Sequence, residues 1–492
     1  MTDLALDPLG LLVVIPLLGA LAAFAWPRGA TGLSLLVGLA NLAVAAALAV
    51  KVATVGPAHH ALGGWGAPLG IDLAADGLSV LMLLMTAVIG LLVSFTAAAA
   101  FAATPGEDDA AARRRACFPP LWLLLLTGLN ALFLSRDVFN LYVTLEIVAL
   151  ASVGLAVLSG TRAALEAGLR YLVASLLGSL LFLLGVGLIY SAYGRLDLDG
   201  LAALAAPAPV ASAALVAMLA GLALKSALFP LHFWLPAAHA NATAPASALL
   251  SALVVKGALY VALRLFTEVF APADPLALLV GLLGAAAVLW GSLEALRAER
   301  LKLLVAWSTV AQIGLIFVAF ALSGTIGSAA AWQGAVLLML AHAIAKAAMF
   351  LAAGRIAEAA GHDLIARLDR ATVRPGLALF AFGLATISLI GLPPSAGFVG
   401  KWLLMEGALT AGGWAWLAVA LFGTALTAAY LARPLAAFLR FDRVRRPLAD
   451  EYAWRLSDLP PLALALMAVA FGLVATQTLD LLAIGSPLGI AP

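Results

Sequence analysis

The chain alternates long apolar runs with short polar connections over its whole length. A helix needs about 20 apolar residues to cross the hydrocarbon core of a bilayer, so each run is one candidate membrane span. The pattern predicts about fourteen spans, near 9–26, 31–52, 77–103, 117–135, 138–159, 167–193, 209–228, 245–270, 275–296, 301–323, 327–353, 376–402, 411–432 and 459–485.

Composition supports an all-α integral membrane protein. Of the 492 residues, 64% are hydrophobic and 11% are charged, whereas soluble domains average about 25% charged residues. The net charge of +2 does not favour a nucleic-acid partner. Cys117 is the single cysteine, which excludes an intrachain disulfide and a thiolate metal cluster. Because no Walker loop, CxxC pair or dinucleotide-binding motif occurs, we expect neither a cofactor nor a metal.

The basic residues between the runs predict the orientation of the chain. If the N-terminus lies outside, most loop arginines fall on the inner side of the membrane. The first run follows an acidic start without the basic region of a cleaved signal peptide, so we expect it to be the first span. Inner loops of membrane proteins are enriched in lysine and arginine, so both termini are expected on the outer side of the membrane. The outer side then carries only Lys51, Arg136, Arg195 and Arg264.

The lysines are distributed differently from the arginines. Of six lysines, four lie inside predicted spans, whereas the arginines fall at or near span ends. Arginine stays charged in proteins, but a buried lysine can lose its proton. A proton path needs sites that alternate between these two forms. The alternative is that the lysines snorkel to the interface or pair statically, which is easiest for the last of them. The four lysines are Lys225, Lys256, Lys346 and Lys401.

Two further residue types accompany these lysines inside spans. Glu146 lies mid-span, where a bare carboxylate costs about 2.5–3.5 kcal/mol, so we expect Lys225 to face it. A static ion pair is the alternative. His342 lies four residues before Lys346, hence on the same helix face. Its imidazole can pass a proton to the amine, or it can serve helix packing alone.

Two stretches cannot continue as regular helix. Pro230–Pro236 places a proline at each end, and each proline lacks an N–H and clashes with the preceding turn. Ile390–Lys401 contains two prolines and three glycines. Paired breaks in two halves indicate inverted repeats with an ion site near the midplane. His232 and His239 flank the first break, each as a relay at the mouth of the path or as an interfacial residue. Trp234 is expected in the interfacial aromatic belt.

Six stretches in this order, between about residue 120 and residue 402, carry a resemblance to a known family. They are FNLYVTLEIVALAS, ALKSALFPLHFWLPAAH, PASALLSALVVKGALYVALR, LKLLVAWSTVAQIGLI, LAHAIAKAAMFLAAG and GLPPSAGFVGKW. The sequence resembles the antiporter-like, proton-conducting membrane subunits of Mrp-type Na⁺/H⁺ antiporters, respiratory complex I and membrane-bound hydrogenases. The resemblance implies fourteen helices, with two inverted five-helix repeats and broken helices seven and twelve. It also implies a polar chain along the midplane, formed by Glu146, Lys225, Lys256, His342, Lys346 and Lys401.

We divide the chain into N-terminal helices (1–116), an antiporter-like core with the proton path (117–402) and C-terminal helices (403–492). A lysine at position 401 and the stretch GLPPSAGFVGKW favour the D-type member of the Mrp complex, while the stretch AAHANATAPASA departs from what is expected there. We therefore expect a proton-translocating subunit of a hetero-oligomeric Na⁺/H⁺ antiporter, with other membrane subunits as partners. The alternatives are a pump module of a complex I-type or hydrogenase enzyme, a subunit of an inorganic-carbon uptake complex, or a non-conducting scaffold.

Overall fold

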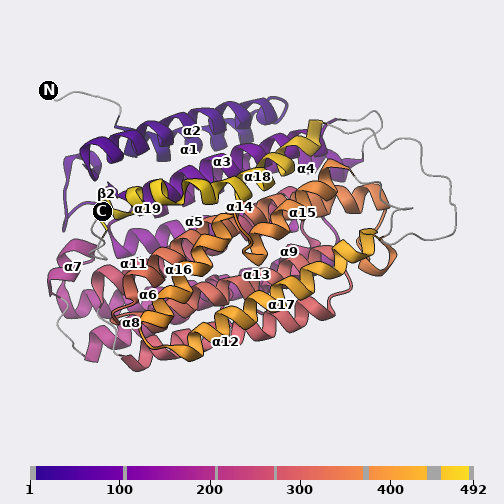
Figure 1. Cartoon of the computed structure of the whole chain (residues 1–492). Coiled ribbons are helices and arrows are strands. Elements are labelled where there is room, and N and C mark those ends of the chain that lie inside the picture. Colours follow the sequence, from indigo (N-terminus) through magenta and orange to yellow (C-terminus); the bar gives the residue numbers. More distant parts are fainter. Residues whose placement is uncertain are drawn as a thin grey trace, which may run out of the picture.

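The computed structural model describes residues 7–103, 108–204, 209–270, 274–368, 376–439 and 456–486. Within these residues, twelve helices are long and apolar enough to cross a membrane. The helices lie side by side along one common direction (Figure 1). The chain is therefore a multi-pass integral membrane protein.

The first part of the chain contains six long helices. Several begin at a residue whose side chain accepts a hydrogen bond from a backbone N–H of the first turn, which satisfies a donor that has no partner inside the helix. Asp7, Asp76, Asp108, Asp137 and Thr161 make these caps. The helices are α1 (Pro8–Ala25), α2 (Ala30–Val55), α3 (Gly77–Ala100), α4 (Asp109–Leu134), α5 (Val138–Val157) and α6 (Arg162–Tyr193).

A small antiparallel hairpin interrupts the helical pattern between α2 and α3. Its strands are β1 (Ala58–Ala61) and β2 (Asp72–Ala75), and the short helix η1 (Leu62–Gly64) follows β1. His60 Nδ1 lies 2.6 Å from Asp7 Oδ2, which ties the hairpin to the start of α1. We call this end of the helix bundle the hairpin face. The end of α19 (Ala475–Ala483) also reaches it, where Gly77 N donates to the Ile484 carbonyl at 2.9 Å.

The middle of the chain contains the first break. After α7 (Leu198–Leu204), α8 (Pro209–Lys225) stops and helix resumes only at α9 (Leu235–Asn241). The next span, Ala244–Val269, is continuous but irregular. It consists of α10 (Ala244–Leu249), the π-helical turn η2 (Leu250–Val254), α11 (Val255–Arg264) and the π-helical turn η3 (Leu265–Val269).

The second half repeats the arrangement of long helices around a break. The break falls between α15 (Leu377–Ile390) and α16 (Ala396–Thr410). The stretch 376–402, which was predicted as one span, is therefore two helices. The other elements are α12 (Asp274–Arg297), α13 (Leu301–Phe317), η4 (Val318–Leu322), α14 (Ser328–Ala360), η5 (Ile365–Arg367), α17 (Trp414–Leu439), η6 (Leu456–Asp458), α18 (Leu459–Ala470) and η7 (Phe471–Val474).

The long helices agree in position with the predicted spans, and α8 and α15 are shorter apolar helices that end at the two breaks. An apolar stretch of 18 residues is completely buried in the Ala244–Val269 span and in α14, whereas only a third of such a stretch is buried in α1 and in α2. These two helices thus form the centre of the bundle. The orientation was predicted from basic residues in the loops, and some of these lie outside the described residues. They are Arg370, Arg374, Arg440, Arg443, Arg445, Arg446 and Arg455.

Candidate proton path

The first part of the candidate path is an ion pair between α5 and α8. Lys225 Nζ lies 3.2 Å from Glu146 Oε1, as the sequence predicts. Two serines on α6 complete the contact: Lys225 donates to Ser175 Oγ at 3.1 Å, and Ser179 donates to the Glu146 carboxylate. The serines are four residues apart and so share one helix face. The pair is therefore held between three helices.

Close packing of α6 and α8 positions Lys225. A Cβ atom built on Gly221 would lie 2.3 Å from the Gly178 carbonyl oxygen, far inside ordinary contact distance, so only glycine fits there. Lys225 follows Gly221 by one turn and therefore faces α6. Because Lys225 is the last residue of α8, the chain beyond it is free to turn away.

The break after Lys225 is held by buried side chains. Trp234 Nε1 donates to the Leu224 carbonyl at 2.8 Å, which satisfies one of the carbonyls freed at the end of α8. Its ring stacks on Tyr171 with centroids 4.2 Å apart. The prediction that Trp234 belongs to an interfacial belt is wrong, because the side chain is 1% exposed.

The two histidines near the break lie in different surroundings. His232 packs between Phe229 and Trp307, with ring centroids 5.4 Å away in each case. His239 is completely buried, which excludes an interfacial position for it. Neither ring nitrogen of His239 has a hydrogen-bond partner within the part of the chain that the structure describes.

Lys256 lies at the centre of the bundle, completely buried. It lies two residues after the π-helical turn η2, an irregularity that often accompanies functional sites. Its amine donates to the Ser251 carbonyl, and the Ser251 hydroxyl lies 2.9 Å from Thr309 Oγ1 of α13. A cavity of about 10 Å³, near the minimum for one water molecule, lies between α8 and this span, with Lys225 in its wall.

Lys346 reaches the same helix α13 from the other side. Its amine donates to the Val305 carbonyl at 2.8 Å and to the Ser308 hydroxyl. Thr309 Oγ1 also donates to the Val305 carbonyl, at 3.3 Å. Lys346 and Ser251, the contact residue of Lys256, thus meet the same short stretch of α13.

His342 lies one turn before Lys346 and is 3% exposed. It is close enough to Lys256, Lys346 and Lys401 for their charges to act on it. Among the described residues, neither of its ring nitrogens has a hydrogen-bond partner. No hydrogen bond to another described residue therefore fixes the tautomer of this imidazole.

Lys401 lies at the second break, on the first turns of α16. Its amine donates to the carbonyls of Leu389 and Ile390 at 3.0 and 2.9 Å, which are the last carbonyls of α15. A cation is favoured there because these carbonyls carry the negative end of the helix dipole. The lysine is 3% exposed, so the snorkelling alternative is wrong.

The structure adds partners that the sequence analysis missed. All are hydroxyl-bearing side chains on neighbouring helices, and serine is too common in apolar helices to stand out without its partner. The four-residue spacing of two serines on α6 was the one available signal. These partners are Ser175, Ser179, Ser251, Ser308 and Thr309.

Comparison with known proteins identifies the family. The family model described as "NADH:quinone oxidoreductase/Mrp antiporter, TM" matches residues 135–427. The chain belongs to this family.

Individual relatives fall in two branches of the family. The chain is 36% identical to the N-type subunit of the NADH-quinone oxidoreductase of Desulforudis audaxviator, over 86% of this chain and 84% of that one. It is 31% identical to the D-type subunit of the Na(+)/H(+) antiporter of Bacillus subtilis, over 76% and 74%. Among solved structures, the Mrp complex from Dietzia sp. superposes with a TM-score of 0.86 at 28% identity, over 97% of this chain and 96% of the other. The family resemblance inferred from the sequence is confirmed.

Proposed function

We propose that this family member is the proton-translocating subunit of a multi-subunit Na⁺/H⁺ antiporter in a bacterial cytoplasmic membrane. The observation that carries the proposal is the ion pair between the buried Lys225 and the half-buried Glu146, which lies between two membrane helices beside further buried titratable groups. A charge on one site changes the cost of a charge on the next, and this coupling is strong where water is scarce. The likeness to D-type antiporter relatives and to the Mrp complex supports the antiporter assignment.

The path runs sideways through the bundle. A proton would pass from the Glu146–Lys225 pair to Lys256, then by way of His342 to Lys346. The last site is Lys401 at the second break. Because these groups include neutralisable amines and an imidazole, each can hold and release a proton. Arginine cannot serve in this way, since it does not lose its proton.

The proposed architecture is fourteen membrane helices with two inverted five-helix repeats. The segments 109–269 and 275–438 each contain five successive spans, if α8 and α15 are counted with their broken continuations. In both segments the fourth span is the broken one. A break at the same place in both segments is what two repeats of one unit would produce, and paired broken helices favour an ion site near the midplane. Both termini would lie outside, on the hairpin face, with other membrane subunits as neighbours.

The test is Na⁺/H⁺ exchange in membrane vesicles that contain the whole complex. Glu146→Gln and Lys225→Ala should each abolish exchange while the complex still assembles. Matched controls are Glu166→Gln and Lys51→Ala, because both residues are exposed and lie away from the path. Normal exchange in either path variant, with intact assembly, would contradict the proposal.

A second function is favoured by the relative with 36% identity, the N-type subunit of an NADH-quinone oxidoreductase. The same buried residues would then move protons in a redox-driven complex. Copurification separates the two functions. Small antiporter subunits would identify an Mrp-type complex, whereas iron–sulfur and quinone-site subunits would identify a respiratory one.

A further inference from the structure

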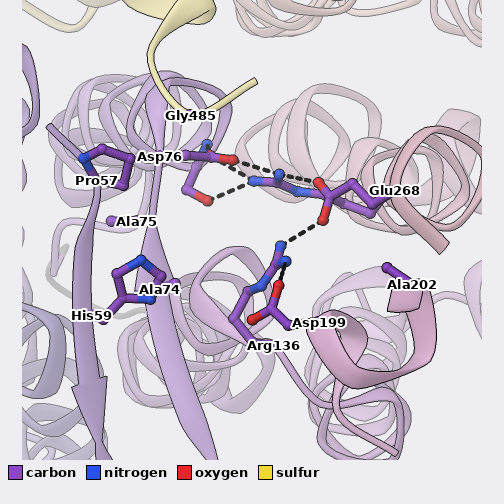
Figure 2. A pocket seen from close by; sticks show the side chains of 12 residues that line it. Pro57, His59, Ala74, Ala75, Asp76, Arg136, Asp199, Ala202, Glu268 and Gly485 are labelled. Carbon is purple, nitrogen blue, oxygen red and sulfur yellow. Dashed lines mark hydrogen bonds and ion pairs between the residues drawn. The ribbon is translucent and has the colours of Figure 1, made fainter. Parts of the chain in front are cut away.

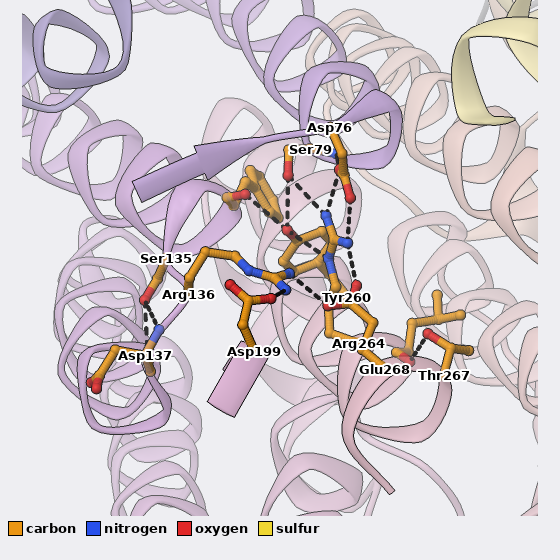
Figure 3. Close-up of polar contacts among 12 residues, drawn as sticks. Asp76, Ser79, Ser135, Arg136, Asp137, Asp199, Tyr260, Arg264, Thr267 and Glu268 are labelled. Atoms are coloured by element: carbon orange, nitrogen blue, oxygen red, sulfur yellow. Dashed lines mark hydrogen bonds and ion pairs between the residues drawn. The ribbon is translucent and has the colours of Figure 1, made fainter. Parts of the chain in front are cut away.

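A cluster of charged side chains closes the bundle at the hairpin face, away from the path. It brings together four elements that lie far apart in the sequence (Figure 3). Two positive and three negative residues take part, and we call them the ion-pair cluster. They are Asp76 at the start of α3, Arg136 between α4 and α5, Asp199 of α7, and Arg264 and Glu268 at the end of the Ala244–Val269 span.

Arg264 is the centre of the cluster and is only 4% exposed. Its two terminal nitrogens hold Asp76 in a bidentate pair at 2.5 and 2.6 Å, and it also contacts the Glu268 carboxylate. The other oxygen of Glu268 accepts from Arg136 at 2.5 Å. Arg136 in turn donates to Asp199 at 2.5 Å. The carboxylates of Asp76 and Glu268 therefore accept hydrogen bonds from arginine.

A cavity of about 300 Å³ opens beside the cluster, and the same charged residues form its wall (Figure 2). Arg264 and Ser79 line this cavity, and both also contact the hydroxyl of the buried Tyr260. The two residues therefore lie between the cavity and Tyr260. Other residues that line the cavity are Pro57, His59 and Gly485.

The cluster continues toward the path along one helix face. Lys256, Tyr260, Arg264 and Glu268 follow one another at intervals of four residues, so they form a single stripe. From Lys256 to Arg264 the helix rises about 12 Å. Only Tyr260 lies between them in this stripe. The stripe thus connects a proposed proton carrier with an open cavity.

The contacts along this stripe do not form a proton wire. Tyr260 accepts a hydrogen bond from Arg264 Nε at 3.0 Å and donates its own to the Phe133 carbonyl at 2.8 Å. Its hydroxyl oxygen also lies 3.2 Å from Ser79 Oγ, which itself accepts a hydrogen bond from Arg264. Arginine does not release its proton, and among the described residues no hydrogen bond joins Tyr260 to Lys256. The Lys256 amine points the other way along the helix, to the Ser251 carbonyl.

The charge on Asp76 also persists near neutral pH. Burial alone would raise the pKa of the Asp76 carboxyl, but the Arg264 guanidinium and its hydrogen bonds hold that pKa below its ordinary value. Asp76 therefore stays ionised and bound to Arg264 near neutral pH. A carboxylate held in this way is a poor proton acceptor.

We propose that Arg264, with Asp76 and Glu268, is a proton seal at the hairpin-face end of the Ala244–Val269 span. The seal keeps a proton on Lys256 from leaving through the cavity, so that it moves sideways toward Lys346. This rests on the proposed function, because Lys256 needs a seal only if it carries protons.

The test is passive proton leak in proteoliposomes that contain the assembled complex without Na⁺. The double variant Arg264→Gln/Asp76→Asn removes both charges together, so no buried carboxylate is left facing an uncharged partner at this pair. With a membrane potential imposed, it should raise the leak several-fold. Asp199→Asn, at the exposed rim of the cluster, should leave the leak at the wild-type level. An unchanged leak in the assembled double variant would overturn the proposal.

A third substitution shows whether the leak passes Lys256. Adding Lys256→Met to the double variant should return the leak to the wild-type level. A leak that persists would overturn the proposal, since protons would then cross elsewhere. The proposed function is decided separately, by the exchange rate of Glu146→Gln with the cluster intact.

Thiol labelling tests the seal without disturbing it. In a Cys117→Ser background, Lys256→Cys should stay unlabelled by a membrane-impermeant thiol reagent added at the hairpin face. Lys51→Cys, exposed near the same face, is the positive control. Labelling of the cysteine at position 256 would overturn the proposal even if the double variant fails to assemble.

Discussion

Gly221→Ala tests whether the Lys225–Glu146 pair depends on the close approach of α6 and α8. The new Cβ atom would lie 2.3 Å from the Gly178 carbonyl oxygen, whereas ordinary contact begins at 3.4 Å. Since backbone cannot yield as a side chain does, the two helices must separate by about 1 Å. Lys225 is one turn away and would move with α8. The 3.2 Å contact with Glu146 then approaches the limit of about 4 Å for an ion pair.

The size of the effect follows from two separate costs. Overpacking of this kind destabilises a protein by about 1–3 kcal/mol. A hydrogen bond to a charged group contributes about 1.5–3 kcal/mol. If that contact supports proton transfer, its loss slows exchange about tenfold to about a hundredfold, at about 1.4 kcal/mol per factor of ten. The expected fall in exchange is therefore larger than the loss of assembled complex.

The assay compares initial Na⁺/H⁺ exchange rates in vesicles, normalised to the amount of assembled complex. Gly187→Ala is the matched control, because it lies on α6 with nothing within 4 Å of the new Cβ atom. The control should exchange at the wild-type rate. A wild-type rate in Gly221→Ala with full assembly would refute the reasoning.

Three further outcomes are expected. Lys401→Met should stop exchange but keep assembly, because replacing a buried charge by an apolar side chain is often tolerated; failure to assemble would assign the lysine to structure instead. Ser308→Ala should slow exchange several-fold by removing a partner of Lys346, and an unchanged rate would contradict this. The depressed pKa of Asp76 means that its carboxylate stabilises the fold above about pH 4 and loses this as the pH falls further. Asp76→Asn should therefore make the melting temperature of the solubilised complex less sensitive to acid, and equal sensitivity would contradict the assignment.

The membrane helices were predictable because the bilayer sets their length and composition. Each long apolar run had to become a helix, since only helices satisfy their own backbone hydrogen bonds in lipid. The pairing of Lys225 with Glu146 was predictable because a charge without a partner of opposite sign is costly in an apolar medium.

Other features depended on contacts that the sequence does not display. The prolines predicted the second break. The helix α15, however, ends just before them at Gly391, whose φ of +84° is a conformation that glycine adopts readily. The hairpin lies in a short connection that had no strong alternating pattern. Arg264 was expected in an outer flank, yet the structure buries it against Asp76, which lies 188 residues away in the sequence. Such a partner is invisible in one sequence.

Proton uptake into vesicles measures the role of the buried lysines most directly. Lys256 is the middle site of the path, completely enclosed, and no route between the two breaks avoids it if the path is as proposed. Uptake should be lost in the assembled Lys256→Met complex and retained in Lys51→Met, which removes an exposed lysine. Equal uptake in both variants would contradict a proton path through the centre of this protein.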